Sequence, residues 1–312
     1  MVTIPHHTGG QRRPWTALPA PVVEEIERLL GARVTGATDQ PGGFSEGVAA
    51  RVRLADGTHA FVKAAQTARA PAAAAFHRRE APISERLAGL APVPRLLGAY
   101  DDGDWVALAF EEIDGRLPAQ PWRRDELDRV LETAGELAAL LTPSPVEERL
   151  LARPRLGGWA ALTSPEARQA LAVLAPWAAD RLDELAGAEA GAESPYQGDT
   201  LLHGDLYPFN VLICPDRVVV VDWPHAWAGA PYADVVTLLS SARLSGVEPQ
   251  PLADAHPLTR HLAAAQIDDL LVLHAGFLLR LAVTAGPGAD RALLKMATAL
   301  GRASLDWLRE RW

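Results

Sequence analysis

The chain has 312 residues, of which 48% are hydrophobic and 22% are charged, and its formal net charge is −9 at pH 7. The length allows one large domain or two lobes, and the composition is that of an ordinary soluble globular protein. The negative charge argues against a nucleic-acid partner, because such proteins present a basic surface.

The cysteine content and the hydropathy bear on location. Cys214 is the only cysteine, so there is no disulfide framework, which fits a reducing compartment. Residues 1–14 lack the apolar core of a signal peptide. No apolar run reaches the ~18 residues that a membrane-spanning helix needs. We therefore expect a cytoplasmic protein without a membrane partner.

The first part of the chain predicts a small lobe that is rich in strands. Residues 1–18 predict a flexible tail, followed by a helix that begins near Pro21 and ends at Gly31. Apolar patterns and turn residues then predict strands over 48–54, 59–63 and 105–110, with a helix over 73–90.

After a boundary near 113–115 the pattern becomes mostly helical. Helices are expected over 125–141, 165–187, 231–243, 258–284 (in two pieces) and 288–310, with a short mixed strand region over 200–222. Strands first and helices later are typical of an α+β chain. We therefore predict a tail over 1–18, a small β-rich lobe over 19–113 and a large helical lobe over 114–312.

The most informative segment is residues 203–210, His-Gly-Asp-Leu-Tyr-Pro-Phe-Asn, followed by an apolar strand that ends at Asp222. Asp205 can orient and deprotonate a substrate hydroxyl, while Asn210 and Asp222 supply oxygen ligands for Mg²⁺ against nucleotide phosphates. A helix-capping turn would explain residues 203–205 alone, but not Asn210 and Asp222. The joint pattern therefore predicts a phosphoryl-transfer site.

A glycine-rich loop and an ion pair support this interpretation. Residues 41–47, Pro-Gly-Gly-Phe-Ser-Glu-Gly, can lie close over phosphates, although alone they would indicate a hairpin turn and they do not form a Walker A loop. Lys63 ends a strand from which it can reach the α- and β-phosphates. Glu80 on the next helix can pair with it, and Glu85 is a weaker candidate for that pairing.

Two further residues are expected to support the loop that contains Asp205. His203 can help to position this loop, and Asp234, at the start of a helix, can brace its backbone, although a plain N-cap would give the same pattern. There is no His/Cys metal cluster, and no serine lies in a triad pattern, so we do not expect a hydrolase.

With these motifs, residues 40–243 resemble the aminoglycoside phosphotransferase family, within the protein-kinase-like fold that also includes choline and homoserine kinases. The resemblance implies a bilobal fold, ATP or GTP as phosphate donor, Mg²⁺, and transfer of the γ-phosphate to a hydroxyl of a small molecule. It also implies nucleotide contacts by Gly42, Gly43, Phe44, Ser45, Gly47, Lys63, Glu80, Phe110, Glu111 and Ile113. Asp222-Trp223-Pro224 departs from the aspartate-phenylalanine-glycine of protein kinases, so activation-loop control is not implied.

The acceptor molecule is harder to infer. The balanced charge of residues 245–312 argues against a strongly cationic acceptor, whereas the acidic stretch over 180–199 argues for one. Flat surfaces for a sugar or nucleoside-like acceptor could come from Trp159, Trp177, His225 and Trp227, although most of the tryptophans are expected in the core.

We therefore expect an antibiotic kinase that confers resistance, with an aminoglycoside or a nucleoside- or sugar-containing acceptor. The alternatives are a kinase of a primary metabolite such as choline or homoserine, an inactive nucleotide-binding module of the same fold, and a kinase acting on a protein. The expected partners are a nucleoside triphosphate and a small hydroxylated acceptor, and both a monomer and a homodimer remain open.

Overall fold

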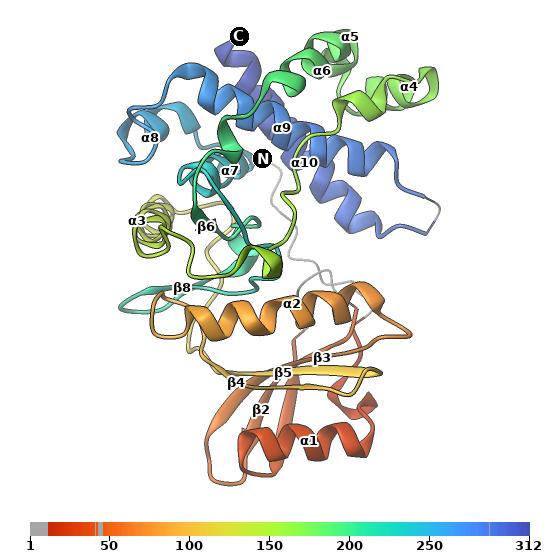
Figure 1. The fold of residues 1–312 in the computed structure, drawn as a ribbon, viewed down its shortest axis with the longest axis vertical. Coiled ribbons are helices and arrows are strands. Elements are labelled where there is room, and N and C mark those ends of the chain that lie inside the picture. Colours follow the sequence, from red (N-terminus) through yellow and green to blue (C-terminus); the bar gives the residue numbers. More distant parts are fainter. Residues whose placement is uncertain (1–11, 41, 43–45, 287) are drawn as a thin grey trace.

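The computed structural model describes residues 12–40, 42, 46–286 and 288–312, which form two lobes (Figure 1). The smaller lobe contains an antiparallel five-stranded sheet in the order β1-β2-β3-β5-β4. Its strands are β1 (Val34–Asp39), β2 (Val48–Leu54), β3 (His59–Gln66), β4 (Leu96–Asp101) and β5 (Trp105–Glu111). This α+β, bilobal arrangement is the predicted fold class.

Two helices cover the opposite faces of this sheet (Figure 1). On the outer face, α1 (Ala20–Leu30) buries Val22 and Ile26 against the apolar side chains of the sheet. It ends at Gly31, whose φ of 73° is left-handed and costs a glycine little. On the other face, α2 (Pro71–Leu87) packs its alanines against Ala65 and Val106. The second helix therefore lies between the sheet and the larger lobe.

The sequence pattern did not predict the two edge strands of this sheet, β1 and β4. Among the described strands, β1 pairs with β2 alone and β4 with β5 alone. Each pairing has a shift in register next to a glycine, at Gly36 and Gly98. Their side chains are half-buried or exposed rather than alternating between core and solvent. A strand without an apolar face gives no period-two signal, because that signal comes from burial on one side.

The larger lobe is mostly helical. Its helices are α3 (Arg124–Leu140), α4 (Pro165–Leu174), α5 (Pro176–Asp180), α6 (Leu182–Gly191), α7 (Ala233–Ala242), α8 (Pro249–Ala255), α9 (Ala264–Val283) and α10 (Arg291–Arg311). The single helix predicted over 165–187 is three short ones, since Pro176 cannot donate the backbone hydrogen bond that would continue α4. The long helices α9 and α10 pack along each other.

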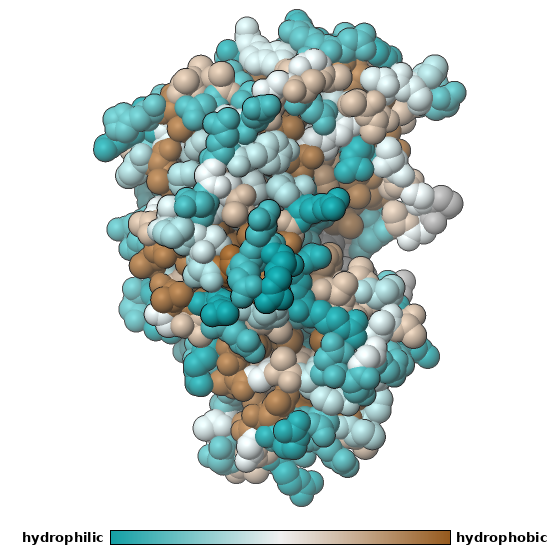
Figure 2. Space-filling model, in the orientation of Figure 1, coloured by the Kyte–Doolittle hydropathy of each residue, from teal (hydrophilic) through white to brown (hydrophobic). Residues whose placement is uncertain are grey.

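Four short strands lie in the larger lobe, between its helices and α2 (Figure 1). β6 (Thr200–Leu202) pairs with β9 (Trp227–Gly229), and β7 (Val211–Ile213) pairs with β8 (Val218–Val220). The β7–β8 hairpin therefore begins just after Asn210 and ends two residues before Asp222. The space-filling view shows the surface hollowed between the two lobes on the right-hand side (Figure 2). No helix in the described ranges has the length and apolarity to cross a membrane.

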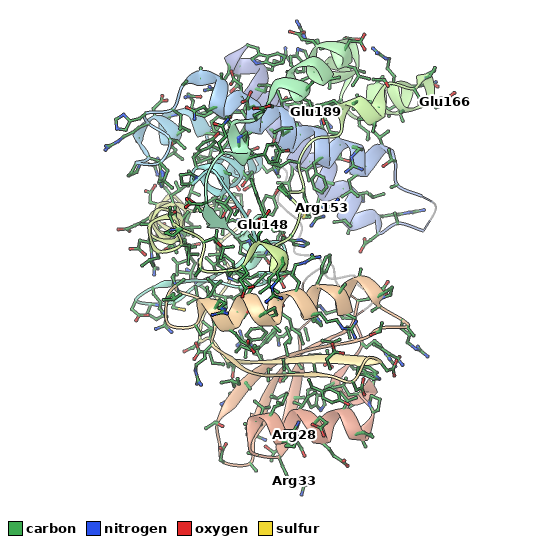
Figure 3. The ribbon with its side chains drawn as sticks, in the orientation of Figure 1. Arg28, Arg33, Glu148, Arg153, Glu166 and Glu189 are labelled. Carbon is green, nitrogen blue, oxygen red and sulfur yellow. The ribbon has the colours of Figure 1, made fainter. Side chains whose placement is uncertain are left out.

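Trp159 lies at the centre of the core of the larger lobe. Its side chain is fully buried, and its indole N–H donates to the carbonyl of Val272 at 2.8 Å. The carboxylate of Glu189, which projects from α6 (Figure 3), accepts the N–H groups of Gly158 and Trp159, each at 2.6 Å. These bonds fix the end of the segment over 151–158, which leads from the interlobe region into the core.

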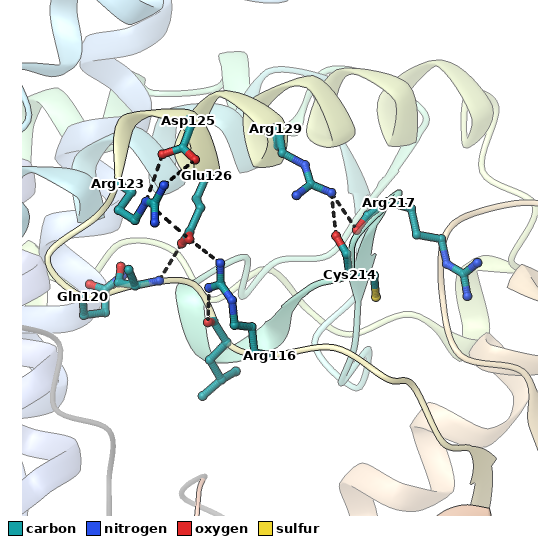
Figure 4. A network of polar contacts seen from close by, with 10 residues as sticks. Arg116, Gln120, Arg123, Asp125, Glu126, Arg129, Cys214 and Arg217 are labelled. Atoms are coloured by element: carbon teal, nitrogen blue, oxygen red, sulfur yellow. Dashed lines mark hydrogen bonds and ion pairs between the residues drawn. The ribbon is translucent and has the colours of Figure 1, made fainter.

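The connector between the lobes runs over residues 112–123, from the end of β5 to the start of α3. It is attached to the larger lobe (Figure 4). Arg116 exchanges two backbone hydrogen bonds with Ile213 of β7, at 3.1 and 2.7 Å. The buried carboxylate of Glu126 on α3 accepts from the Arg116 guanidinium at 2.6 Å and from the N–H of Ala119 at 2.7 Å. The connector is therefore held by both α3 and the β7–β8 hairpin.

The predicted tail is described only from residue 12 onward, and residues 1–11 lie outside the described residues. The backbone N–H of Arg13 donates to the carbonyl of Gly47 at 2.8 Å, and that of Trp15 donates to Asp39 Oδ1 at 2.7 Å. Leu18 is buried in the core formed by α1 and the sheet. Residues 12–18 therefore run along the sheet, next to the glycine-rich loop.

The packing around Trp159 leads to a prediction for stability. A Cβ atom at Gly276 of α9 would lie 2.7 Å from the Trp159 indole nitrogen. We expect Gly276→Ala to lower the free energy of unfolding by about 1–3 kcal/mol, because neither α9 nor the buried ring can move freely. Urea denaturation would measure the change.

Gly187→Ala is the matched control, since Gly187 also lies inside a helix, α6, and a Cβ there meets nothing within 4 Å. It should be neutral or stabilising by up to ~1 kcal/mol. Equal stability of the two variants would contradict the packing described here.

Candidate active site

A cavity of about 1150 Å³ lies between the two lobes. Its lining comes from β2, β3, β5 and α2 of the smaller lobe, from the connector, and from residues 204–212, 221–225 and both α9 and α10 of the larger lobe. Ligand pockets commonly measure ~300–1,000 Å³, so this cavity is large enough for a nucleotide and a second small molecule.

Lys63 is the central charged group of the cavity. Its ammonium donates to both carboxylate oxygens of Glu80, at 2.8 and 2.9 Å, and to Asp222 Oδ1 at 2.6 Å. The Lys63 and Glu80 side chains are only 13% and 2% exposed. Glu85, the weaker candidate for this pairing, is exposed on the same helix. The structure therefore brings together Lys63, Glu80 and Asp222 from three distant parts of the chain.

The mutual contacts keep Lys63 and Asp222 charged. Burial acts to raise the pKa of Asp222, but the charge and hydrogen bond of Lys63 outweigh it, so that this pKa lies well below its usual range. Burial acts to lower the pKa of Lys63, but the negative charges of Asp222 and Glu80 leave it raised. An ionised carboxylate at Asp222 is the form that a hard cation requires.

Asp222 has an unusual backbone. Its φ of 69° is the only positive φ at a non-glycine position in the described part of the chain. Such a conformation is uncommon outside glycine and is held by its surroundings. The next residue, Trp223, is fully buried, and its indole N–H donates to the carbonyl of Val220 at 3.1 Å. This anchored ring keeps the chain in the turn that presents Asp222 to Lys63.

The loop that contains Asp205 is fixed by Asp234 at the start of α7. The Asp234 carboxylate accepts the backbone N–H of His203 at 2.7 Å and that of Gly204 at 3.0 Å. The His203 ring donates through Nε2 to the carbonyl of Val221 at 3.0 Å, and its Nδ1 accepts the N–H of Asp205 at 3.2 Å. His203 therefore connects the Asp205 loop to the strand that leads to Asp222.

Asn210 joins Asp205 to the hairpin. Its side-chain N–H group donates to the carbonyl of Asp205 at 2.8 Å and to Oδ2 of the same residue at 3.0 Å. The backbone N–H of Val221 donates to the Asn210 carbonyl at 2.9 Å. The two ends of the β7–β8 hairpin therefore lie together, and they offer the Asn210 amide oxygen and the Asp222 carboxylate as hard oxygen donors that fit Mg²⁺.

The described residues contain no cluster of three or more His, Cys, Asp or Glu side chains with metal-binding geometry. Mg²⁺ bound at nucleotide sites commonly takes one or two protein oxygens and completes its shell with phosphates and water. The donor set of Asn210 and Asp222 fits that mode of binding.

The residues expected around the nucleotide fall partly within the described chain. The cavity is lined by Gly42, Lys63, Phe110, Glu111 and Ile113, whereas Gly43, Phe44 and Ser45 lie outside the described residues. At Gly47, φ is 133° and a Cβ atom would lie 2.6 Å from the carbonyl oxygen of Ala64. Only glycine fits this close approach between the loop and β3.

Arg12 is a cleft residue that the sequence interpretation missed. It lines the cavity together with Lys63 and Asp222, forms a parallel bridge with Gly47, and donates through Nε to the carbonyl of Gly42 at 2.5 Å. It was assigned to the flexible tail because no local pattern precedes it. Its position depends on the pairing of residues 12–13 with a loop thirty or more residues away.

Of the four aromatic residues expected at the acceptor pocket, only His225 lines the cavity. Trp159 is buried in the core, Trp227 packs against Gly204 and Tyr196, and Trp177 lies 6.1 Å from the ring of Trp312 near the end of α10. These three tryptophans are therefore not among the described residues that line the cavity.

The wall opposite α2 is formed by α9 and α10. It carries Phe277, Leu278, Leu281, Leu293, Met296, Ala297 and Leu300, which pack with Tyr207 and Phe209 from the Asp205 loop. The helical periodicity of these residues is the same as that of a buried core, so the sequence offered no sign that they face a cavity.

His225 and Arg155 lie at the mouth of this apolar region. The Arg155 guanidinium donates to Nε2 of His225 at 3.1 Å and lies over the Phe277 ring, 4.9 Å from its centroid. The His225 ring is 4.8 Å from that of Phe76 on α2. Burial, aided by the charge of Arg155 and opposed by that of Asp205, lowers the pKa of His225 to about 4, so the imidazole is neutral at pH 7.

A family model described as "Phosphotransferase enzyme family" matches residues 42–264. A search of curated proteins found no match.

Three solved structures have a similar fold. A ternary complex of a thermostable mutant of the aminoglycoside phosphotransferase APH(4)-Ia with AMP-PNP and hygromycin B is 14% identical, with a TM-score of 0.60 over 93% of this chain and 99% of that one. The amicoumacin kinase hAmiN with AMP-PNP, Ca²⁺ and its ligand Ami is 14% identical, with a TM-score of 0.59 over 94% of each chain. A choline/ethanolamine kinase family protein from Mesorhizobium loti is 17% identical, with a TM-score of 0.61 over 92% of this chain and 97% of that one.

At these identities the structures show the shared fold. It is the kinase-like arrangement of a five-stranded lobe and a helical lobe. The APH(4)-Ia and hAmiN complexes both contain AMP-PNP, and the hAmiN complex also contains Ca²⁺.

His274, beneath the Asp205 loop, leads to a prediction for pH dependence. Its Nε2 lies 2.7 Å from the Tyr207 hydroxyl and its Nδ1 lies 2.8 Å from Ser304 Oγ. Burial lowers its pKa to about 4, whereas a histidine in an unfolded chain titrates near ~6.5. Because the unfolded state takes up the proton first as the pH falls, the contribution of His274 to stability should decrease from about pH 6.5 to 4, by about 2 kcal/mol at pH 5.

Urea denaturation at pH 7 and pH 5 would measure this change. His274→Gln should lose less stability than the wild type between the two pH values, whatever its stability at pH 7. His261→Gln, at an exposed position, should keep the wild-type difference. The same pH dependence in His274→Gln and the wild type would contradict a neutral, buried His274.

Proposed function

Because the chain belongs to the phosphotransferase enzyme family, we propose that it transfers the γ-phosphate of ATP or GTP to a hydroxyl group of an antibiotic or a related hydroxylated metabolite. The observation that carries this proposal is the convergence of Asp205, Asn210 and Asp222 with the Lys63–Glu80 pair on one cavity. Residues 19–113 would bind the nucleotide and residues 114–312 the acceptor.

Each group has a role that follows from its surroundings. Asp205, whose carboxylate accepts from Asn210 and whose backbone N–H donates to the His203 ring, would orient the acceptor hydroxyl and accept its proton. Lys63, held by Glu80, would exchange its contact with Asp222 for the α- and β-phosphates. Asn210 and Asp222 would hold Mg²⁺, which neutralises phosphate charge when it is bound. Rate enhancement would then come from positioning and charge compensation.

Antibiotic kinases share this fold, and so does a choline/ethanolamine kinase family protein, so the fold alone leaves the acceptor open. Mg²⁺-dependent consumption of ATP and GTP should be measured against aminoglycosides, nucleoside antibiotics, macrolides, choline and homoserine, with mass spectrometry of the acceptor. An antibiotic that gains one phosphate would support a role in resistance. Phosphorylation of choline or homoserine alone would contradict the antibiotic part.

The catalytic assignment predicts different effects for the two carboxylates. Asp205→Ala should lower turnover by about 10²- to 10⁴-fold but leave Mg²⁺-nucleotide binding in place. Asp222→Ala should also lose Mg²⁺-nucleotide binding, because it removes a ligand of the ion. Steady-state rates and calorimetric titration with AMP-PNP would separate these effects.

Asp216→Ala is the control for this pair, since Asp216 lies in the β7–β8 hairpin between the two positions and its side chain is 75% exposed. It should keep both turnover and nucleotide binding. Near-normal turnover in Asp205→Ala would rule out Asp205 as the base.

We also expect Arg12 to supply positive charge to the nucleotide phosphates, because it lines the cavity beside Lys63 and contacts the glycine-rich loop. Arg12→Ala should weaken ATP binding by about tenfold, the effect of losing one charge-assisted hydrogen bond.

Arg13→Ala serves as the control, since the contact of Arg13 with Gly47 uses the backbone and survives the substitution. Its affinity for ATP should match the wild type. Equal affinities for ATP in Arg12→Ala and Arg13→Ala would exclude the phosphate role of Arg12.

A further inference from the structure

We infer that the acceptor half of the cavity, the part lined by α9, α10 and the Asp205 loop, selects an apolar hydroxylated molecule that is neutral or anionic rather than a polycation. Arg155 faces the negative or hydrogen-bond-accepting group of that molecule. This inference rests on the proposed function, because it concerns the acceptor of the same cleft. Three observations carry it: the positions of the carboxylates, the apolar wall of α9 and α10, and the position of Arg155.

The described carboxylates that line the cavity lie on the nucleotide side or are groups proposed to act in phosphoryl transfer. The described lining contains Glu46, Glu80, Glu111, Glu112, Asp205 and Asp222. Glu46 belongs to the glycine-rich loop, Glu80 binds Lys63, and Glu111 and Glu112 lie at the connector, where they pair with Arg95 and Arg51. Asp222 binds Lys63 as well. Among the described residues, the acceptor half therefore retains one carboxylate, Asp205, and the hydroxyl that reacts needs that group.

The acidic stretch over 180–199 does not supply the missing charge. None of its carboxylates lies among the described residues that line the cavity. Asp180, Asp183 and Glu184 surround a separate surface pocket beside Trp177. Glu189 is bound to the backbone of Gly158 and Trp159. The carboxylates of this stretch, which argued for a cationic acceptor, therefore lie away from the described lining of the cavity.

Apolar side chains form most of the surface that an acceptor would meet. Phe277, Leu281, Leu293 and the other lining residues of α9 and α10 pack with Tyr207 and Phe209, which follow Asp205 in the chain. An ammonium group moved from water to such a surface without a carboxylate loses hydration that nothing replaces. An apolar acceptor gains free energy there through the area that it buries.

Arg155 is the cation of this half. It lies in the segment over 151–158 whose end is fixed by Glu189, so the backbone that carries it is well anchored. The described carboxylates form no ion pair with it; its contacts are the neutral ring of His225 and the face of Phe277. Its donors can therefore bind an acceptor oxygen, while its charge repels an ammonium group.

Two matched probes separate these possibilities. ω-Hydroxydodecanoate and ω-aminododecanol share an apolar chain and a terminal hydroxyl, but they carry opposite charges. We would titrate each at sub-micellar concentration, and hygromycin B as a polycation, into the full chain loaded with Mg²⁺ and AMP-PNP. Wild-type protein should bind the carboxylate compound about tenfold more tightly than the amine and should not bind hygromycin B over the same range.

Variants at two positions of one segment test the role of Arg155. In Arg155→Ala the preference for the carboxylate compound should fall to about twofold or less, and Arg155→Lys should restore most of it, because the charge returns. Arg153→Ala is the control, since Arg153 is exposed two residues away and does not line the cavity (Figure 3). It should keep the full preference.

Several outcomes would overturn the inference. They are equal or tighter binding of the amine, binding of hygromycin B, an unchanged preference in Arg155→Ala, and failure of both chain compounds to bind while AMP-PNP is bound. Failure to bind AMP-PNP with Mg²⁺ at all would instead count against the proposed function, so the two ideas fail in different ways.

Discussion

The cleft depends on the two ion pairs that the ammonium group of Lys63 forms. This ammonium lies between two carboxylates, one on α2 of the same lobe and one at Asp222 of the other lobe. A buried ammonium without such partners would lose far more hydration than a fold of ordinary stability can replace. The sheet, α2 and the turn at Asp222 must therefore assemble together, and this requirement sets how the two lobes face each other.

Hydrogen bonds of His203 and Asp234 maintain the turn at Asp222. His203 spans from the Asp205 loop to the carbonyl of Val221, and Asp234 holds the backbone of that loop from the start of α7. The strained φ at Asp222 persists because these neighbours leave the chain little alternative. The groups expected to act on the phosphate and on the hydroxyl are therefore positioned by one connected network.

The cavity has two halves with different chemistry. The half next to the sheet and α2 contains the paired charges of Lys63, Glu80 and Asp222 together with Gly42, which suit phosphates and a divalent ion. The half against α9 and α10 is apolar and carries the guanidinium of Arg155. The net charge of −9 is thus a poor guide to the acceptor, because much of the negative charge lies on outer surfaces or is consumed by internal contacts.

The sequence alone determined the fold class, the positions of the central strands and the grouping of Asp205, Asn210 and Asp222, because local periodicity and short spacings encode these features. Only the tertiary structure placed Arg12 and Arg155 in the cleft and the predicted tryptophans outside it. The edge strands β1 and β4 also appear only in the structure, because neither has a buried apolar face that would give a period-two pattern. A helical face shows the same apolar period whether it meets a core or a cavity, and an arginine in a loop has no pattern at all. Their positions follow from contacts between residues that are far apart in the chain.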